Sequence, residues 1–370
     1  MERNYNNIEE IRKSGTEVYS ISRLDCINRC LYEAYRTYIL GQRGKGNIYS
    51  NLGGRIHEVL EGITNGTKTE VDLLPAMQAE LEDLDMLGIE FPKGKNGEDT
   101  IRQSWIEDMT HFCKTYKAPK GKELVAEEQF IYHTPKGVVL QGYIDLQFIR
   151  PDGSIDIYDY KTSTMYKGAD IDEHARQLIV YALGKEQEGK KVHSASWIFL
   201  KYVTVKYFGK KTARSKEMSW ITKDIERRKI GKELTQAVTD LMQEEGYDDV
   251  EIGLITEEFQ HTNDFDVLPE DVRGYFIMHP CIINADLTEE AKQECINYIE
   301  STVEKWESLS GEEKDYPPRK FTRIQKSGKE VGDYFFCTSL CGHFDNCPHI
   351  KYFLEDLQDK QRSDPDEDLF

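Results

Sequence analysis

The sequence predicts an α/β fold, in which a central mixed β-sheet is flanked by helices. Two observations lead to this prediction. Apolar residues recur at helical spacing through much of the first 120 residues, and a block of alternating apolar and polar residues follows. Further helical patterns come after the alternating block, and this mixture is expected of a sheet covered by helices.

The N-terminal part of the chain is predicted to be helical. Residues 20–40 have apolar positions at helical spacing, with Ser20 or Ser22 as the N-cap. After a glycine-rich stretch a second helix begins at RIHEVLEGI, which contains His57. Two further amphipathic helices are expected over residues 71–88 and 99–117.

The segment after residue 120 is predicted to be an antiparallel meander. ELVAEEQFIYH, KGVVLQGYIDLQFI and SIDIYDYK each suit a strand, and the turn-forming sequences HTPKG and RPDGS separate them. A helix (171–186), a strand (SASWIFLKYVTV) and two long helices (221–247 and 286–309) should follow. The predicted regions are a helical N-terminal region (1–120), a core (121–205), a helical insertion (206–335), a cysteine segment (336–352) and an acidic tail (353–370).

The composition is that of a polar globular chain. Its 370 residues are 38% hydrophobic, and no apolar run approaches the roughly 20 residues that a membrane helix needs. The first residues lack the apolar core of a signal peptide, so we expect a cytoplasmic protein with no membrane partner. The net charge of −19 excludes a protein that coats nucleic acid by its overall charge. Contact with nucleic acid would need local basic patches or bound metal ions.

Two carboxylates and a lysine are predicted to converge at one end of the sheet. Asp145 lies in one strand of the meander, and Asp159 and Lys161 are two residues apart in the next, so both point to the same face. Carboxylates that hold Mg²⁺ or Mn²⁺, with a nearby ammonium group, can hydrolyse a phosphodiester. The alternative is a solvated face with an ordinary ion pair.

Neighbouring residues favour a site over an open surface. Ile155 and Ile157 share the face of Asp159, so the charges extend an apolar face. Gln177 and Tyr181 are four residues apart on the next predicted helix and therefore share one side of it. His57, on an earlier helix, offers a further metal ligand.

The order of these motifs resembles the RecB/AddB branch of the PD-(D/E)XK nuclease superfamily. The motifs are G-x-x-H, E-x-x-F, G-x-x-D, D-x-K followed by Thr-Ser, and Q-x-x-x-Y. The CRISPR-associated adaptation nucleases with iron–sulfur clusters belong to the same branch, and stand-alone phage and prokaryotic RecB-like exonucleases are similar. The resemblance covers residues 20–205 and the C-terminal cysteines.

The resemblance implies a restriction-endonuclease-like core and a role for each motif residue. It implies Mg²⁺ or Mn²⁺ ligation and catalysis by Asp145 and Asp159, and catalysis by Lys161. It implies further metal ligands in the His57 side chain and the Tyr160 carbonyl, and positioning of the nucleic acid strand by Gln177 and Tyr181. Glu127 matches the E-x-x-F glutamate, and the adjacent Glu128 is the alternative.

Three of the eight cysteines lie within eleven residues, in the pattern Cys337-x3-Cys341-x5-Cys347. Three thiolates leave one place vacant in a tetrahedral sulfur site. The resemblance implies a [4Fe–4S] cluster with Cys30 as the fourth ligand and Cys26 as its substitute, although the family more often has C-x2-C first. Such a cluster would join the two ends of the chain. The alternative is a structural Zn²⁺ site completed by His343 or His349.

Two segments are locally basic, namely KYVTVKYFGKKTARSK, which contains Lys210 and Lys211, and RKFTRIQKSGK. Cations interleaved with aromatic residues suit a single-stranded nucleic acid path, and solvated loops are the alternative. The final DPDEDLF is either a solubilising tail or a hook for a partner such as a single-stranded-DNA-binding protein.

These observations lead us to expect a metal-dependent DNA exonuclease that acts on single-stranded or end-containing DNA in recombination, repair or phage DNA metabolism. The sequence has no G-x-x-x-x-G-K-[ST] motor motif, so the enzyme would act alone or beside a helicase or recombinase. The alternatives are a non-cleaving iron–sulfur subunit that binds DNA or serves as a scaffold, and an RNA-directed nuclease.

Overall fold

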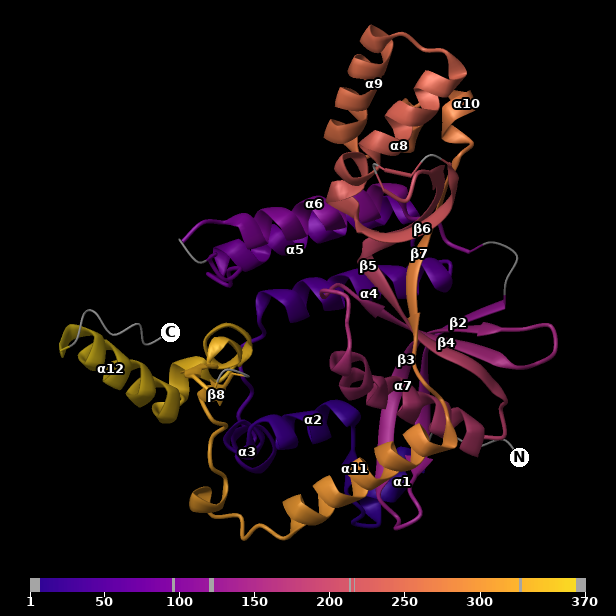
Figure 1. Ribbon diagram of the computed structural model, residues 1–370. Helices are drawn as coiled ribbons and strands as arrows, with labels where there is room; N and C mark the ends of the chain where they lie inside the picture. The colour runs from indigo at the N-terminus through magenta and orange to yellow at the C-terminus, as the bar shows by residue number, and fades with distance from the viewer. Residues whose placement is uncertain are drawn as a thin grey trace.

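A seven-stranded sheet forms the centre of the protein and has helices on both faces (Figure 1). The structure is a computed structural model that describes residues 7–94, 97–119, 123–212, 214–215, 217–325 and 328–363. The arrangement confirms the predicted α/β class. The end of the predicted acidic tail, residues 364–370, lies outside the described residues. No described helix is both long enough and apolar enough to traverse a lipid bilayer.

The predicted meander is confirmed and continues into a crossover. Strands β2, β3 and β4 pair antiparallel in sequence order, β5 then pairs parallel to β4, and β6 and β7 both pair antiparallel to β5. The strands of the sheet are β1 (Val18–Tyr19), β2 (Glu123–His133), β3 (Val139–Ile149), β4 (Ile155–Lys161), β5 (Val192–Gly209), β6 (Ser219–Glu226) and β7 (Phe276–Asn284). A separate pair consists of β8 (Thr322–Ile324) and β9 (Glu330–Gly332).

Each face of the sheet has its own set of helices. One face packs with α2 (Ile21–Arg29), α3 (Leu31–Ala34), α7 (Ala169–Gln187) and α11 (Glu289–Glu307). The other face packs with α4 (Ile48–Thr64), α5 (Leu73–Met86) and α6 (Thr100–Thr115). A third core joins β5 and β6 to α8 (Ile230–Glu245), α9 (Asp249–Thr262) and α10 (Glu270–Arg273). Helices α1 (Asn7–Lys13) and α12 (Pro348–Ser363) lie near the chain ends.

Two of the predicted helices are divided differently in the structure. The predicted helix over residues 20–40 breaks at Cys30, whose backbone is extended (φ −157°), and the chain then continues as α3 and a π-helical turn. The start of the predicted helix over 221–247 is wrong, because residues up to Glu226 extend β6, and α8 begins only at Ile230. The pairing of β6 with β5 outweighs the local helical pattern.

The segment predicted as a helical insertion (206–335) also contributes strands to the central sheet. It contains β6 and β7, and β7 runs along β5 from the α8–α10 unit towards α11 (Figure 1). The three helices α8, α9 and α10 therefore project from the end of a β5–β6–β7 extension.

Candidate active site and cysteine cavity

The register of β3 and β4 brings the two predicted aspartates together. Leu146 pairs with Tyr158, so Asp145 and Asp159 lie one residue further along this pair of strands, at the end of β4. The backbone N–H of Tyr160 donates to Asp145 Oδ2 at 2.8 Å and fixes that carboxylate. Ile155 and Ile157 are buried in the core beneath the same face, which confirms the predicted alternation.

Lys161 links the aspartates to helix α7. Its Nζ atom lies 2.6 Å from Asp159 Oδ2 and donates to Gln177 Oε1 at 2.9 Å. Gln177 Nε2 in turn donates to the Tyr181 hydroxyl at 2.7 Å. Helical spacing of four places Gln177 and Tyr181 on the side of α7 that faces β4. Four side chains therefore form one connected chain of contacts.

The charges in this chain of contacts support one another in a buried setting. Burial raises the pKa of Asp159, whose side chain is only 2% exposed, and the adjacent Lys161 ammonium opposes that effect. Burial alone would lower the pKa of Lys161. The negative charge of Asp159, together with the other nearby groups, has the larger, opposite effect, so the pKa of Lys161 is raised overall. Lys161 is therefore a protonated ammonium at neutral pH, held at the end of β4.

His57 reaches the same site from helix α4. Its Nδ1 atom lies 3.3 Å from Asp145 Oδ2. Burial would lower the pKa of His57, but the hydrogen bond and the charge of Asp145 raise it overall. The small residue Gly53 permits this approach, because a Cβ there would lie 3.3 Å from Thr162 Oγ1 at the end of β4.

Two other motif positions are explained by packing. The Phe130 ring of E-x-x-F packs edge-on against Tyr181, with ring centroids 5.4 Å apart. A Cβ at Gly142, the glycine of G-x-x-D, would come 2.7 Å from that ring, and one at Gly184 on α7 would come 2.4 Å from it. These glycines allow α7 to press against β2 and β3 and hold Tyr181 at the site.

The structure distinguishes between the two adjacent glutamates. Glu128 turns to Lys185 and Gln147, with contacts of 2.5 and 2.6 Å, so it serves the packing of α7. Glu127 lies near Asp145: burial raises the pKa of Glu127, and the charge of Asp145 adds to this effect. Its φ of +51° is in the left-handed region and interrupts β2 opposite Asp145.

Sequence reasoning missed one further acidic residue, Glu61. Its charge also contributes to raising the pKa of Glu127, so it lies near the same site. Glu61 follows His57 by four residues on α4, and this helical spacing was the signal that could have found it.

The donor set fits a hard divalent cation. Among the described residues no three His, Cys, Asp or Glu side chains are gathered in metal-binding geometry. The carboxylates instead contact Lys161, His57 and the Tyr160 N–H. Asp159 Oδ2 is nevertheless buried and accepts no well-directed hydrogen bond, although Lys161 Nζ is close. Carboxylate oxygens and an imidazole nitrogen are ligands that Mg²⁺ or Mn²⁺ accepts.

The four cysteines of the predicted cluster line one small cavity. Cys30 comes from the break between α2 and α3, and Cys337, Cys341 and Cys347 come from the C-terminal segment. None of the eight cysteines is in a disulfide. Burial raises the thiol pKa of Cys337 to about 11 and that of Cys341 to about 12. The backbone N–H of Arg319 donates to Cys30 Sγ at 3.4 Å.

The three residues expected as alternative ligands have different positions relative to the cavity. Cys26 is buried in the core and is absent from the lining of the cavity. His343 lines the cavity, but its Nε2 atom is 2.9 Å from Thr37 Oγ1. His349 instead packs edge-on against Tyr32.

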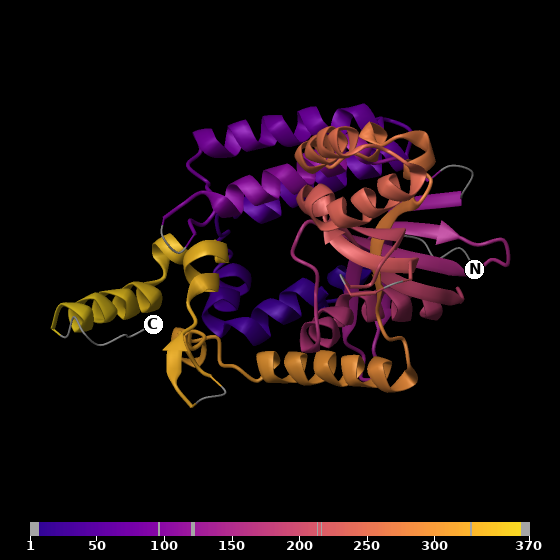
Figure 2. The ribbon, with the colours of Figure 1, turned by 45° about the horizontal axis from the view of Figure 1, so that its top comes forward.

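Contacts with the N-terminal region fasten the cysteine segment. The Lys45 N–H donates to the Gly342 carbonyl at 2.9 Å, and Asn47 Nδ2 donates to the Leu340 carbonyl at 3.1 Å. Arg36 donates to the Asn346 carbonyl at 2.9 Å. In Figure 2 the C-terminal segment lies beside the N-terminal helices, away from the sheet. The two ends of the chain thus meet around the cavity.

The two predicted basic positions lie apart from the carboxylate site. Lys161 pairs with Phe199 on β5, whereas Lys210 and Lys211 follow the end of that strand. At about 3.3 Å per residue they lie roughly 35–40 Å further along the chain. Lys210 is also paired with Asp240, at 3.3 Å.

Residues 18–313 match the PD-(D/E)XK nuclease superfamily, and this range contains His57 and every motif residue of the carboxylate site. The chain belongs to this superfamily. A PD-(D/E)XK nuclease is a phosphodiesterase that binds nucleic acid, and such nucleases typically use Mg²⁺ or Mn²⁺. The match ends before the three C-terminal cysteines.

No curated protein matches the sequence. One similar solved structure, described as "Crystal structure of SSO0001", is 12% identical over 86% of this PD-(D/E)XK chain and 94% of that chain, with a TM-score of 0.27.

Proposed function

We propose that this PD-(D/E)XK protein is a deoxyribonuclease that acts as an exonuclease on single-stranded or end-containing DNA. The observation that carries the proposal is the buried chain of contacts from Asp159 through Lys161 to Gln177 and Tyr181. A solvated ion pair would not be 2% exposed on its acidic side, nor tied to a glutamine and a tyrosine of another element. The role of the superfamily as nucleases agrees with this arrangement.

Each residue is assigned a role in hydrolysis. Asp145, Asp159, His57 and the Tyr160 carbonyl would hold Mg²⁺ or Mn²⁺, which, when bound, lowers the pKa of a water molecule and offsets phosphate charge. Lys161 holds a proton and a positive charge where the attacked phosphate gains negative charge.

Gln177 and Tyr181 keep that ammonium in place. Gln177 accepts from Lys161 and donates to Tyr181, so it sets the direction of the ammonium group. We propose that the same pair positions the DNA strand, and that Lys210 and Lys211 contact phosphates further along its path.

We also propose that Cys30, Cys337, Cys341 and Cys347 hold a [4Fe–4S] cluster, which would place the protein in the RecB/AddB-like branch. The shared cavity and the N–H donated to Cys30 Sγ support four sulfur ligands. The cluster would brace the chain rather than take part in hydrolysis. The second candidate is a Zn²⁺ site, because His343 also lines the cavity and could serve as a zinc ligand.

The test is a nuclease assay on internally labelled linear and circular single strands of DNA and RNA, with Mg²⁺, Mn²⁺ or EDTA. An exonuclease degrades the linear DNA, spares the circle and stops in EDTA. Cleavage of the circle would replace the exonuclease with an endonuclease, and preference for RNA would replace the DNA substrate. Binding of DNA without cleavage in either metal would instead support a non-cleaving subunit.

A further inference from the structure

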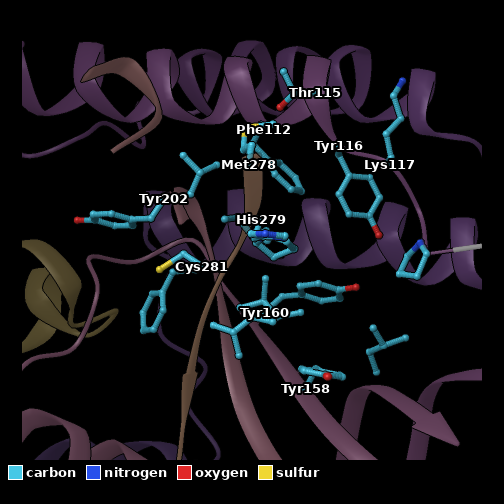
Figure 3. A pocket seen from close by; sticks show the side chains of 18 of the residues that line it. Phe112, Thr115, Tyr116, Lys117, Tyr158, Tyr160, Tyr202, Met278, His279 and Cys281 are labelled. Atoms are coloured by element: carbon cyan, nitrogen blue, oxygen red, sulfur yellow. The ribbon is translucent and has the colours of Figure 1, made fainter. Parts of the chain in front are cut away.

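A second cavity lies behind the catalytic strand. Its volume is about 320 Å³, and it sits between the C-terminal end of α6 and the strands β3, β4, β5 and β7 (Figure 3). Tyr158 and Tyr160 of β4 line it. Because side chains alternate along a strand, Asp159 and Lys161 point to the opposite face. These two side chains are therefore across the sheet from the cavity, whereas the Tyr160 ring lies 6.0 Å from the His57 ring.

An irregularity in the sheet accounts for this space. The pairing of β5 with β7 loses register between Ile198 and Val203, and Pro280 stands opposite Val203. Both edges of this irregular stretch line the cavity. Regular strands would bring the side chains of α6 into close contact with the sheet, whereas here a space of ligand size remains. Ligand sites occupy roughly 300–1,000 Å³, so the volume suits a small molecule.

Aromatic side chains dominate the walls of the cavity. They come from three elements: Phe112 and Tyr116 at the end of α6, Phe148 on β3, and Tyr158 and Tyr160 on β4. In Figure 3 Phe112 and Tyr116 lie above the space and Tyr158 and Tyr160 below it. Aromatic faces on opposite sides of a cavity favour a planar ring between them.

Arg227 adds a positive charge to this aromatic setting. It lines the cavity, is only 7% exposed, and donates to the Leu200 carbonyl at 2.7 Å and to Thr115 Oγ1 at 2.9 Å. Across the described part of the chain it forms no ion pair with a carboxylate, whereas its neighbour Arg228 pairs with Asp108 at 3.2 Å. Burial lowers the Arg227 pKa to about 10, so the group stays charged at neutral pH.

The Arg227 guanidinium also lies 3.3 Å from His111 Nδ1 and 5.3 Å from the centre of the Phe112 ring, but neither partner carries the negative charge that an anion in the cavity would supply. We propose that the cavity binds a planar aromatic anion of the size of a nucleoside monophosphate, with its ring among the aromatic side chains and its anionic group at Arg227. The cavity adjoins the nuclease site at Tyr160 but lies across the sheet from Asp159 and Lys161, and binding there does not depend on cleavage.

The first test measures binding of dAMP to the full chain in EDTA by isothermal titration calorimetry. We expect saturable binding that is at least about tenfold tighter than that of deoxyadenosine or of deoxyribose 5-phosphate, because each lacks one of the two recognised parts. Lys161→Ala should bind dAMP with unchanged affinity. Loss of binding in Lys161→Ala would put the nucleotide in the carboxylate site and overturn the proposal, as would the absence of saturable binding.

A matched pair of substitutions on β7 locates the ligand. Met278 lines the cavity and its neighbour Ile277 does not, although both are about equally exposed, at 38% and 41%. Met278→Trp should fill the cavity and lower the affinity for dAMP at least about tenfold. Ile277→Trp should leave that affinity unchanged. Equal effects of the two substitutions would contradict the location.

The anion contact is tested separately. Arg227→Gln should remove the preference for dAMP over deoxyadenosine, and an unchanged preference would overturn the role of Arg227. If Arg227→Gln does not fold, the comparison of Met278→Trp with Ile277→Trp still decides the proposal, because both residues are exposed and outside the core.

Discussion

The aspartates and the lysine of the carboxylate site come from adjacent strands of one sheet, and helices α4 and α7 add His57 and Gln177, whereas the cysteines of the cavity come from the two ends of the chain. Asp145, Lys161 and Tyr181 lie within forty residues of one another and are held by strand register and one helix. Cys30 and Cys347 are more than 300 residues apart and meet through a few loop contacts. The carboxylate site should keep its backbone structure when one side chain is removed, because the sheet supports it. The cysteine cavity has no such support, so removal of a cysteine should weaken the connection between the two ends of the chain.

The largest effect should follow Lys161→Ala. We expect cleavage to fall by at least about 10²-fold, because the charge that stabilises the transition state is removed, and the thermal midpoint to stay close to that of the unchanged protein. The measurement is single-turnover cleavage of labelled DNA together with a thermal melt.

The matched control for that variant is Lys185→Met. Lys185 is a buried lysine too, but its ion pairs with Glu128 and Glu188 serve packing. Removing it should cost stability, about 3–5 kcal/mol for a broken buried pair, rather than the chemical step. Near-normal cleavage by folded Lys161→Ala would contradict the proposed catalytic role.

Removal of the divalent metal should affect the carboxylate site alone. We expect EDTA to stop cleavage and added Mg²⁺ or Mn²⁺ to restore it, while iron content and the thermal midpoint stay the same. Iron analysis, melting and cleavage on one preparation test this separation. Parallel loss of iron and activity on brief EDTA treatment would show that the two regions are not independent.

Cys30→Ser should affect the cysteine cavity and leave the residues of the carboxylate site in place. We expect loss of about four iron atoms per chain and of the brown colour, with a lower thermal midpoint, because the tie between the chain ends is lost. Cys26→Ser is the control, since Cys26 lies one helical turn away but outside the cavity. One zinc per chain, sensitive to His343→Ala, would replace the iron–sulfur proposal with a zinc site.

The smallest effect should come from Tyr181→Phe. This substitution removes the hydroxyl that accepts from Gln177 and leaves the ring against Phe130. One hydrogen bond contributes about 1 kcal/mol, so cleavage should fall about fivefold with an unchanged thermal midpoint. No change in rate would show that Lys161 does not need this support.

The local part of the carboxylate site was determined by sequence periodicity. A spacing of two on a strand puts Asp159 and Lys161 on one face, and a spacing of four on a helix puts Gln177 and Tyr181 on one side. The meander and the mixed sheet follow from the same periodicities and their turn sequences. These features depend on backbone geometry within one element, so no distant contact is needed to predict them.

Only the tertiary structure decided which distant elements meet. It turned Glu128 towards Lys185, placed Glu127 near Asp145 and Glu61, interrupted the first long helix at Cys30, and made β7 a strand of the central sheet. It also opened the aromatic cavity behind Tyr160 through a slip in the register of β5 and β7. Each outcome depends on packing between segments far apart in the chain, where contact energies outweigh the local preference of either segment.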